Sequence, residues 1–217
     1  FGAIAYTGGR DGRITAMQRY QRQFRPYVSG RDGLFQSNTW GDRSRDARVT
    51  EAFINVEIEA GKQLGVDIVQ VDDGWQTGKT SNWADSAGGV WNDYWATNKN
   101  FWQPNPQRFP NGLKPVVDAA RFAGLKFGLW YSPDSSNDFS NWDADANTLL
   151  TFHMDLGVNH FKIDGVKATT KAGERNLLRM FDKVLQQSAG QVSFDLDVTA
   201  EIRPGYFLSL IHISEPT

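Results

Sequence analysis

The sequence of 217 residues contains no cysteine. This absence excludes disulfide bonds, thiolate catalysis and metal centres held by cysteine, but it leaves the compartment open, because many exported proteins also lack cysteine. There is no excess of positive charge either, since 23 Lys and Arg residues stand against 25 Asp and Glu residues. Proteins that bind nucleic acid or an anionic membrane usually carry a basic patch, so we expect neither partner. No apolar run approaches the roughly 18 residues of a membrane span, and a soluble protein, cytoplasmic or exported, is expected.

The composition is that of a folded globular domain rich in aromatic residues. Hydrophobic residues make up 40% and charged residues 22% of the chain, so a sizeable core is expected. The chain has 8 Trp, 6 Tyr and 14 Phe residues. Exposed tryptophan often contacts the apolar face of a sugar, whereas core packing accounts for most aromatic residues in any protein.

The two ends of the chain differ from the sequence between them. Residues 1–7 form an apolar run before a turn-rich segment, which predicts the last strand of a preceding domain. We therefore interpret residues 1–30 as the remnant of an upstream β domain and a linker. Residues 208–217 break from the preceding pattern and resemble translated sequencing adapter, so we expect a non-native tail there; a native closing strand is the alternative.

Between these ends, short apolar segments typical of strands alternate with segments of helical periodicity. Such alternation predicts βαβ units and a parallel sheet. The expected strands cover residues 34–40, 66–71, 125–130, 158–163 and 191–198, and the expected helices cover residues 47–64, 112–123, 144–156 and 174–187. On the first helix the pattern predicts one buried face made of Val49, Phe53, Val56, Ala60 and Leu64.

Two parallel architectures fit this alternation. A doubly wound sheet usually has a glycine-rich phosphate turn after its first strand, but residues 38–42 (Asn-Thr-Trp-Gly-Asp) are not such a turn. A barrel places its chemistry at the carboxyl ends of several strands, and polar or aromatic residues stand at all five ends. These are Trp40 and Asp42, Asp72 and Asp73, Trp130 and Asp134, Lys162 and Asp164, and Asp195 and Asp197. The expected fold class is thus α/β, an incomplete (β/α)8 TIM barrel with about the first five βα units, over residues 31–207.

The segment around the fourth expected strand carries a candidate nucleophile. Side chains alternate along a strand, so Lys162 and Asp164 are expected on the same side, where the ammonium group keeps the carboxylate ionised. An ionised, oriented carboxylate is what a glycosidase nucleophile must be. A structural Lys–Asp pair at the strand end is the alternative.

Adjacent carboxylates follow the second expected strand. Asp72 and Asp73 repel one another unless donors occupy their lone pairs, and sugar hydroxyls are suitable donors, with Trp75 offering a stacking face. A solvated acidic turn is the alternative; a metal site is disfavoured because no histidine or third carboxylate stands in register. No metal or cofactor is expected. The long segment 72–110 is expected to be functional, and its tryptophans Trp83, Trp91, Trp95 and Trp102 either line a site or pack in the core.

Four motifs in this order make the chain resemble a known family. Residues 37–43, 71–76, 128–130 and 161–164 are similar to the catalytic barrel of the α-galactosidases of glycoside hydrolase family 36, the melibiase group, over residues 34–207. The resemblance implies an enzyme that hydrolyses terminal α-galactosyl residues from oligosaccharides. It implies Asp164 as the nucleophile of a retaining double displacement, Lys162, Asp72 and Asp73 as ligands of sugar hydroxyls, and Trp40 and Trp130 as residues that line the site.

The sequence departs from the family in two respects. Many members have a Cys- and Gly-rich strand after the nucleophile, where this chain has residues 193–199 (Ser-Phe-Asp-Leu-Asp-Val-Thr). Asp195 and Asp197 in this segment are interpreted as substrate-side or structural carboxylates. The family's acid/base Asp is expected after the end of this chain, so the fragment alone is expected to be inactive.

Three other functions stay open on the sequence alone. They are a galactosyl transferase of the raffinose-synthase type, an α-glucosidase of a related clan, and a non-catalytic sugar-binding protein. The transferase would differ in loops such as residues 72–110, and the binding protein would tolerate loss of Asp164. Whether the full-length parent forms a homo-oligomer is also left open.

Overall fold

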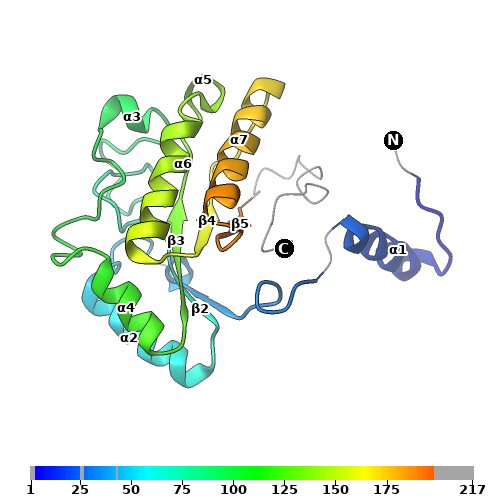
Figure 1. The fold of residues 1–217 in the computed structure, drawn as a ribbon, viewed down its shortest axis with the longest axis horizontal. Helices are drawn as coiled ribbons and strands as arrows, with labels where there is room; N and C mark the ends of the chain where they lie inside the picture. Colours follow the sequence, from blue (N-terminus) through cyan, green and yellow to red (C-terminus); the bar gives the residue numbers. More distant parts are fainter. Residues whose placement is uncertain (1–2, 25–26, 43, 198–217) are drawn as a thin grey trace.

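The computed structural model describes residues 3–24, 27–42 and 44–197, and its centre is one parallel sheet (Figure 1). The strand order is β1-β2-β3-β4-β5, and every neighbouring pair is parallel. The strands are β1 (Gln36–Asn38), β2 (Ile68–Val71), β3 (Lys126–Tyr131), β4 (His160–Ile163) and β5 (Ser193–Leu196). All five predicted strands are confirmed, with bounds that differ by a few residues.

Helices connect the successive strands. The four long connecting helices are α2 (Glu51–Leu64), α4 (Lys114–Phe122), α6 (Trp142–Thr151) and α7 (Lys171–Gln187), and the π-helix η2 (Phe152–Leu156) continues α6. Shorter turns of helix are η1 (Thr39–Asp42), α3 (Tyr94–Thr97) and α5 (Ser136–Phe139). Because sequential parallel strands are joined by right-handed crossovers, the four long helices share one face of the sheet. A doubly wound sheet would reverse its strand order at one point, whereas this order contains no reversal. The fold is therefore a partial (β/α)8 barrel.

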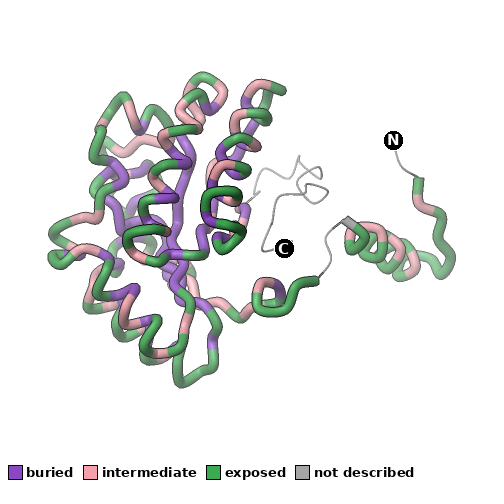
Figure 2. Tube along the Cα trace, in the orientation of Figure 1, coloured by how far each residue is buried: buried purple, intermediate pink, exposed green. Residues whose placement is uncertain are grey.

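The two faces of the sheet differ in chemistry because side chains alternate along each strand. Figure 2 shows that the buried stretches follow the strands and the inner sides of the helices. One face is apolar and packs against α2, α4, α6 and α7. Its residues include Val69, Val71, Leu129, Phe161, Ile163, Phe194 and Leu196 from the strands and Ile54, Ile58, Val116, Ala120, Leu149, Leu177, Met180 and Val184 from the helices.

The opposite face is polar. Gln36 Nε2 donates to Gln70 Oε1 at 2.6 Å, and His160 Nδ1 lies 3.0 Å from Ser193 Oγ. Gly128 separates the two pairs, and a Cβ atom there would lie 3.1 Å from His160 Cδ2. In a barrel the helix-free face is the interior, so this polar face is the one that carries candidate chemistry.

Helix α2 corrects one expectation. Thr50 caps the helix by accepting a hydrogen bond from Phe53 N at 3.3 Å, so the helix begins after residue 50 and not at residue 47. Val56 and Leu64, predicted as buried, are 63% and 74% exposed, whereas Ile54 and Ile58 are buried. The predicted face is thus confirmed in part: Val49 is buried, in the turn before the helix, and Phe53 and Ala60 are half-buried, but Val56 and Leu64 are wrong.

The N-terminal segment is helical. Residues 3–7 form no strand, and α1 (Gly9–Phe24) follows them, so the predicted strand is wrong for the described residues. From Ala16 onward α1 is rich in Gln, Arg, Ala and Met, which favour helix. None of its described side chains is buried, and it lies apart from the sheet (Figures 1 and 2). The origin of residues 1–30 in an upstream β domain stays a prediction.

Two expectations reach past residue 197, the last described residue. The proposed tail at residues 208–217 and the end of the segment 193–199 lie outside the described residues. Among the residues that the structure does describe, no helix has the length and apolar character needed to cross a bilayer.

Candidate active site

Polar residues at the carboxyl ends of β1 and β4, and directly after β2 and β5, meet at the carboxyl edge of the sheet. Asp72 Oδ2 accepts hydrogen bonds from Lys162 Nζ at 2.9 Å and from Asn38 Nδ2 at 3.0 Å. Lys162 Nζ also lies 3.4 Å from Asp197 Oδ2. The structure therefore brings together three predicted site residues, Asp72, Lys162 and Asp197, and it adds Asn38, which sequence reasoning included in a motif without assigning a role.

Lys162 is the cation of this cluster. Burial disfavours its charged form, but the carboxylates of Asp72 and Asp197 outweigh burial and raise the pKa of Lys162. Its side chain is 14% exposed and that of Asp72 only 3%. The ammonium group is thus held charged between two strand ends, with one of its three protons not used by these two carboxylates.

Asp164 follows β4 directly and is oriented by two donors. Gly165 N donates to Asp164 Oδ1 at 2.6 Å, and Trp130 Nε1 donates to Asp164 Oδ2 at 3.2 Å. Burial raises the pKa of Asp164, the charge of Asp197 adds to this rise, and the two donors and Lys162 oppose it. Lys162 lowers the pKa of Asp164 in the expected direction, but burial and the charge of Asp197 outweigh it, and the ammonium group itself pairs with Asp72 and Asp197.

Asp73 faces a different set of partners from Asp72. Its Oδ1 accepts hydrogen bonds from Gln76 Nε2 at 2.7 Å and from Trp83 Nε1 at 2.8 Å, and its Oδ2 accepts one from Thr80 Oγ1. Burial raises the pKa of Asp73 to about 6, against the effect of these donors. Asp73 therefore anchors the insertion formed by residues 74–110, and its predicted contact with a sugar stays a prediction.

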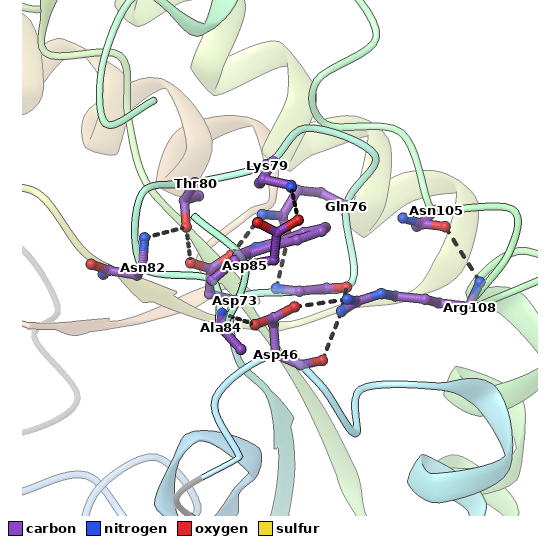
Figure 3. A network of polar contacts seen from close by, with 12 residues as sticks. Asp46, Asp73, Gln76, Lys79, Thr80, Asn82, Ala84, Asp85, Asn105 and Arg108 are labelled. Atoms are coloured by element: carbon purple, nitrogen blue, oxygen red, sulfur yellow. Dashed lines mark hydrogen bonds and ion pairs between the residues drawn. The ribbon is translucent and has the colours of Figure 1, made fainter. Parts of the chain in front are cut away.

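An ion pair between Arg108 and Asp46 fixes the base of the same insertion (Figure 3). Arg108 donates to Asp46 Oδ2 at 2.7 Å, to Asp46 O at 2.7 Å and to Gly74 O at 2.8 Å. Ala84 N donates to the other carboxylate oxygen of Asp46 at 2.7 Å. Gly74 has φ 122° and a Cβ there would lie 2.7 Å from Asp46 Cβ, so only glycine fits this position. No local sequence signal identifies Asp46 and Arg108, which lie 62 residues apart.

The prediction that Trp75 offers a stacking face to a sugar is wrong. Trp75 is 0% exposed, and its indole N–H donates to Trp130 O at 2.9 Å. Its ring packs against Trp102 and Phe152, with centroids 6.0 and 5.2 Å away. An aromatic ring enclosed on all sides cannot contact a sugar, so Trp75 belongs to the core that supports the site.

The other two predicted tryptophans lie nearer the site. Trp130 is also buried, at 1% exposure, but its N–H reaches Asp164. Trp40 is half-buried in η1, and its backbone N–H donates to Asn38 Oδ1 at 2.8 Å, next to the Asn38–Asp72 contact.

A buried carboxylate that the sequence did not single out lies behind β3. Asp145 accepts hydrogen bonds from Tyr131 Oη at 2.7 Å, Trp95 Nε1 at 2.9 Å and Asp134 N at 3.1 Å. Burial raises the pKa of Asp145 to about 7 against these donors. Asp134, which was expected at this strand end, accepts from the backbone of Asp93 at 2.9 Å and thereby holds the insertion against β3.

The described part of the chain contains no group of three or more His, Asp or Glu residues arranged to hold a metal ion. The cluster at the carboxyl edge of the sheet offers the carboxylates of Asp72, Asp164 and Asp197, the ammonium group of Lys162 and the indole N–H of Trp130. A carboxylate held by two donors beside a lysine can attack an electrophilic carbon, and the remaining polar atoms can bind hydroxyl groups.

No protein-family model matches this sequence. Curated relatives include α-galactosidase C of Emericella nidulans, 32% identical over 99 residues that cover 42% of this chain and 12% of the relative. A probable α-galactosidase G of Aspergillus terreus is 40% identical over 81 residues, 34% of this chain and 10% of the relative. Among solved structures, a GH36 α-galactosidase of Geobacillus stearothermophilus matches with a TM-score of 0.59 and 18% identity.

Part of this chain is similar in sequence to curated α-galactosidases, and its fold is similar to that of a GH36 α-galactosidase. Its likeness to the Geobacillus enzyme covers 85% of this chain and 31% of that one. The α-galactosidase of Thermus thermophilus in complex with stachyose matches with a TM-score of 0.58 and 18% identity, over 84% of this chain and 43% of that one. At these identities the structural matches establish the barrel fold. The chain spans only about a tenth of the length of the curated α-galactosidases that it matches.

Proposed function

We propose that this chain is part of the catalytic barrel of a retaining α-galactosidase that removes terminal α-galactosyl residues from oligosaccharides. The observation that carries the proposal is the cluster of Asp72, Lys162, Asp164 and Asp197 at the carboxyl edge of a barrel sheet related to α-galactosidases. Solved neighbours of this fold are described in complex with raffinose and stachyose, which are α-galactosyl oligosaccharides.

In this proposal Asp164 is the nucleophile. One carboxylate oxygen forms a bond to the anomeric carbon as the glycosidic bond breaks, and the leaving oxygen takes a proton from a general acid. Water then attacks the same carbon, gives up its proton to the conjugate base, and releases Asp164. The donors on its two oxygens, Gly165 N and Trp130 Nε1, hold the carboxylate in one orientation, which lowers the entropic cost of attack.

Lys162 and Asp72 provide the contacts for the galactosyl ring. Lys162 retains a proton for a hydroxyl oxygen, and Asp72 Oδ1, which accepts only Asp73 N among the described contacts, retains a lone pair for a hydroxyl proton. Asp72 is buried and Lys162 is half-buried, so a sugar lacking the matching hydroxyl leaves largely desolvated polar groups unpaired. We therefore assign recognition of the galactose hydroxyls to this pair, with Trp40 beside it.

Asp197 is a further carboxylate beside this set, and it is paired with Lys162 at 3.4 Å. A retaining mechanism needs a second carboxyl group about 5 Å from the nucleophile that can protonate the leaving oxygen. We propose that this acid/base group lies in the part of the parent protein beyond residue 197, and that Asp197 acts on the substrate side.

The test is chemical rescue of a nucleophile variant in the full-length parent. Asp164→Gly is expected to lower kcat on an activated aryl α-galactoside by about four orders of magnitude or more, because attack on the anomeric carbon is lost. Azide added to this variant should occupy the space of the carboxylate and yield β-galactosyl azide. Asp155→Gly, at a site in η2 outside the cluster, is the matched control. Near-normal kcat in Asp164→Gly would overturn the assignment. So would the absence of β-galactosyl azide with every α-galactoside tested, whatever its leaving group.

A further inference from the structure

The insertion brings a second tryptophan next to the candidate nucleophile. The ring of Trp91 lies 6.1 Å from that of Trp130, which donates to Asp164. A Cβ atom placed on Gly165 would lie 3.8 Å from Trp91 Nε1. The indole of Trp91 therefore lies beside the residue that follows Asp164, although 73 residues separate Trp91 from Asp164 in the sequence.

Trp91 differs from its aromatic neighbours in exposure. The other tryptophans around it, Trp75, Trp83, Trp102 and Trp130, are at most 7% exposed, whereas Trp91 is half-buried. Trp95 is also half-buried, but its N–H is used by Asp145. Within the described residues the Trp91 N–H makes no hydrogen bond, so both an aromatic surface and a donor remain for a ligand.

The backbone holds Trp91 on both sides. On one side, Val90 N donates to Lys79 O at 3.1 Å, and Val90 O accepts from Ser81 N at 3.2 Å. On the other side, Asp93 N donates to Asp134 Oδ1 at 2.9 Å and to Ser136 Oγ at 2.8 Å. An aromatic side chain on a backbone fixed at both flanks loses little freedom on binding, which favours its use as a contact surface.

Trp91 lies level with Gly165, just beyond the carboxyl end of β4, and this position indicates which sugar unit of a substrate it contacts. Lys162 lies within the strand, Asp164 directly follows it, and Gly165, next to Trp91, lies one residue further toward the carboxyl side. The bond that breaks lies at Asp164. In the proposed function, a galactosyl ring bound by Lys162 and Asp72 would lie on the inner side of Asp164, and the group attached to it would extend past Asp164 toward Gly165 and Trp91.

We propose that Trp91 is a specificity-determining residue that binds the leaving sugar of an α-galactosyl oligosaccharide, by contact with its apolar face and by a hydrogen bond from the indole N–H. This inference rests on the proposed α-galactosidase function. It replaces Trp75, which the sequence suggested as the stacking residue, with a tryptophan from the insertion.

The test compares two substrates in the full-length parent. Raffinose carries a leaving sugar, whereas α-galactosyl fluoride carries a leaving group too small to reach Trp91. Trp91→Ala is expected to lower kcat/KM for raffinose about 10- to 100-fold, the usual effect of losing one well-formed contact, and to change kcat/KM for the fluoride less than twofold. Trp91→Phe, which keeps a ring but not the N–H, should show a smaller loss on raffinose only.

The outcomes separate this inference from the proposed function. Phe122→Ala, at an 82% exposed aromatic residue on α4, is the matched control and should leave both substrates unchanged. Equal losses on raffinose and fluoride in both Trp91 variants would assign Trp91 to the structure of the site and overturn the inference, as would no loss on either. A parent protein that turns over neither substrate would overturn the proposed function, and with it this inference.

Discussion

Lys162 and Asp72 form a 2.9 Å ion pair that crosses the end of a strand, since β3 lies between the strands that carry them. Strands two apart in a sheet are separated by about 9.5 Å, a distance that the long lysine side chain and the aspartate side chain cross together. The pair thus joins β2 to β4 over the end of β3 on the polar face of the sheet.

Asp72 and Asp73 are adjacent in sequence but are expected to respond differently to substitution. Asp72→Asn in the full-length parent removes the anionic partner of Lys162, and we expect the ratio of kcat/KM for α-galactosides over α-glucosides to fall at least tenfold. Asp73→Asn keeps one acceptor oxygen but replaces the other by an NH2 donor, so that Gln76, Trp83 and Thr80 no longer all have an acceptor; we expect destabilisation of about 1 to 3 kcal/mol with a much smaller change in that ratio. Equal loss of the ratio in both variants would support a shared sugar-binding role, as the sequence predicts.

Trp75 is expected to contribute to stability and not to sugar affinity. Trp75→Phe keeps a ring in the core but leaves Trp130 O without its donor, which costs about 1 to 3 kcal/mol. Trp75→Ala also leaves a cavity and should cost about 3 to 5 kcal/mol or more. Chemical unfolding measures both changes, and galactose binding to the folded Trp75→Phe variant measures affinity. A loss of affinity larger than the loss of stability would show that Trp75 does contact the ligand.

Asp145 is expected to make stability depend on pH. Its pKa is raised from 3.8 to about 7 by burial, so the folded state holds a proton that the unfolded state releases above pH 3.8. Its contribution to stability is therefore complete below about pH 4 and declines as pH rises through about 7, by a total on the order of 4 kcal/mol.

Asp145→Asn isolates this contribution, because the amide does not titrate. The melting temperature of the variant should change less between pH 4.5 and pH 7.5 than that of the parent. Asp143→Asn on the same helix, where the carboxylate is exposed and bonded to Lys183, is the matched control. A parallel pH dependence of parent and Asp145→Asn would exclude Asp145 as the titrating group.

The chain expressed alone is expected to aggregate and to lack glycosidase activity. In the described sheet β1 and β5 each pair on one side only, and an unpaired strand edge can pair with other molecules. The five strands of the described residues also do not close a barrel of eight, which leaves its polar face open. Size-exclusion chromatography and an assay with an activated aryl α-galactoside test this expectation. A monomer with a cooperative unfolding transition and measurable turnover would contradict it.

Much of the fold follows from local patterns. Alternation of apolar strands with helical segments predicts β2 to β5 and the helices between them, because strand and helix periods differ and each element buries one face. The predicted face of α2 failed in part, since periodicity alone does not show that the helix begins after the Thr50 cap. The expected strand at residues 3–7 failed because an apolar run becomes a strand only beside a partner strand.

The sequence by itself determined the parallel α/β architecture, the likeness to α-galactosidases, and the strand-end positions of Asp72, Lys162 and Asp164, because these depend on local periods and on short motifs. Only the tertiary structure decided the partners of these residues. It paired Lys162 with Asp72 and Asp197, turned Asp73 toward Thr80, enclosed Trp75 in the core, and brought Trp91 beside Gly165. Most of these contacts join residues far apart in sequence, and strand pairing and the packing of the insertion fix them, neither of which has a local signal.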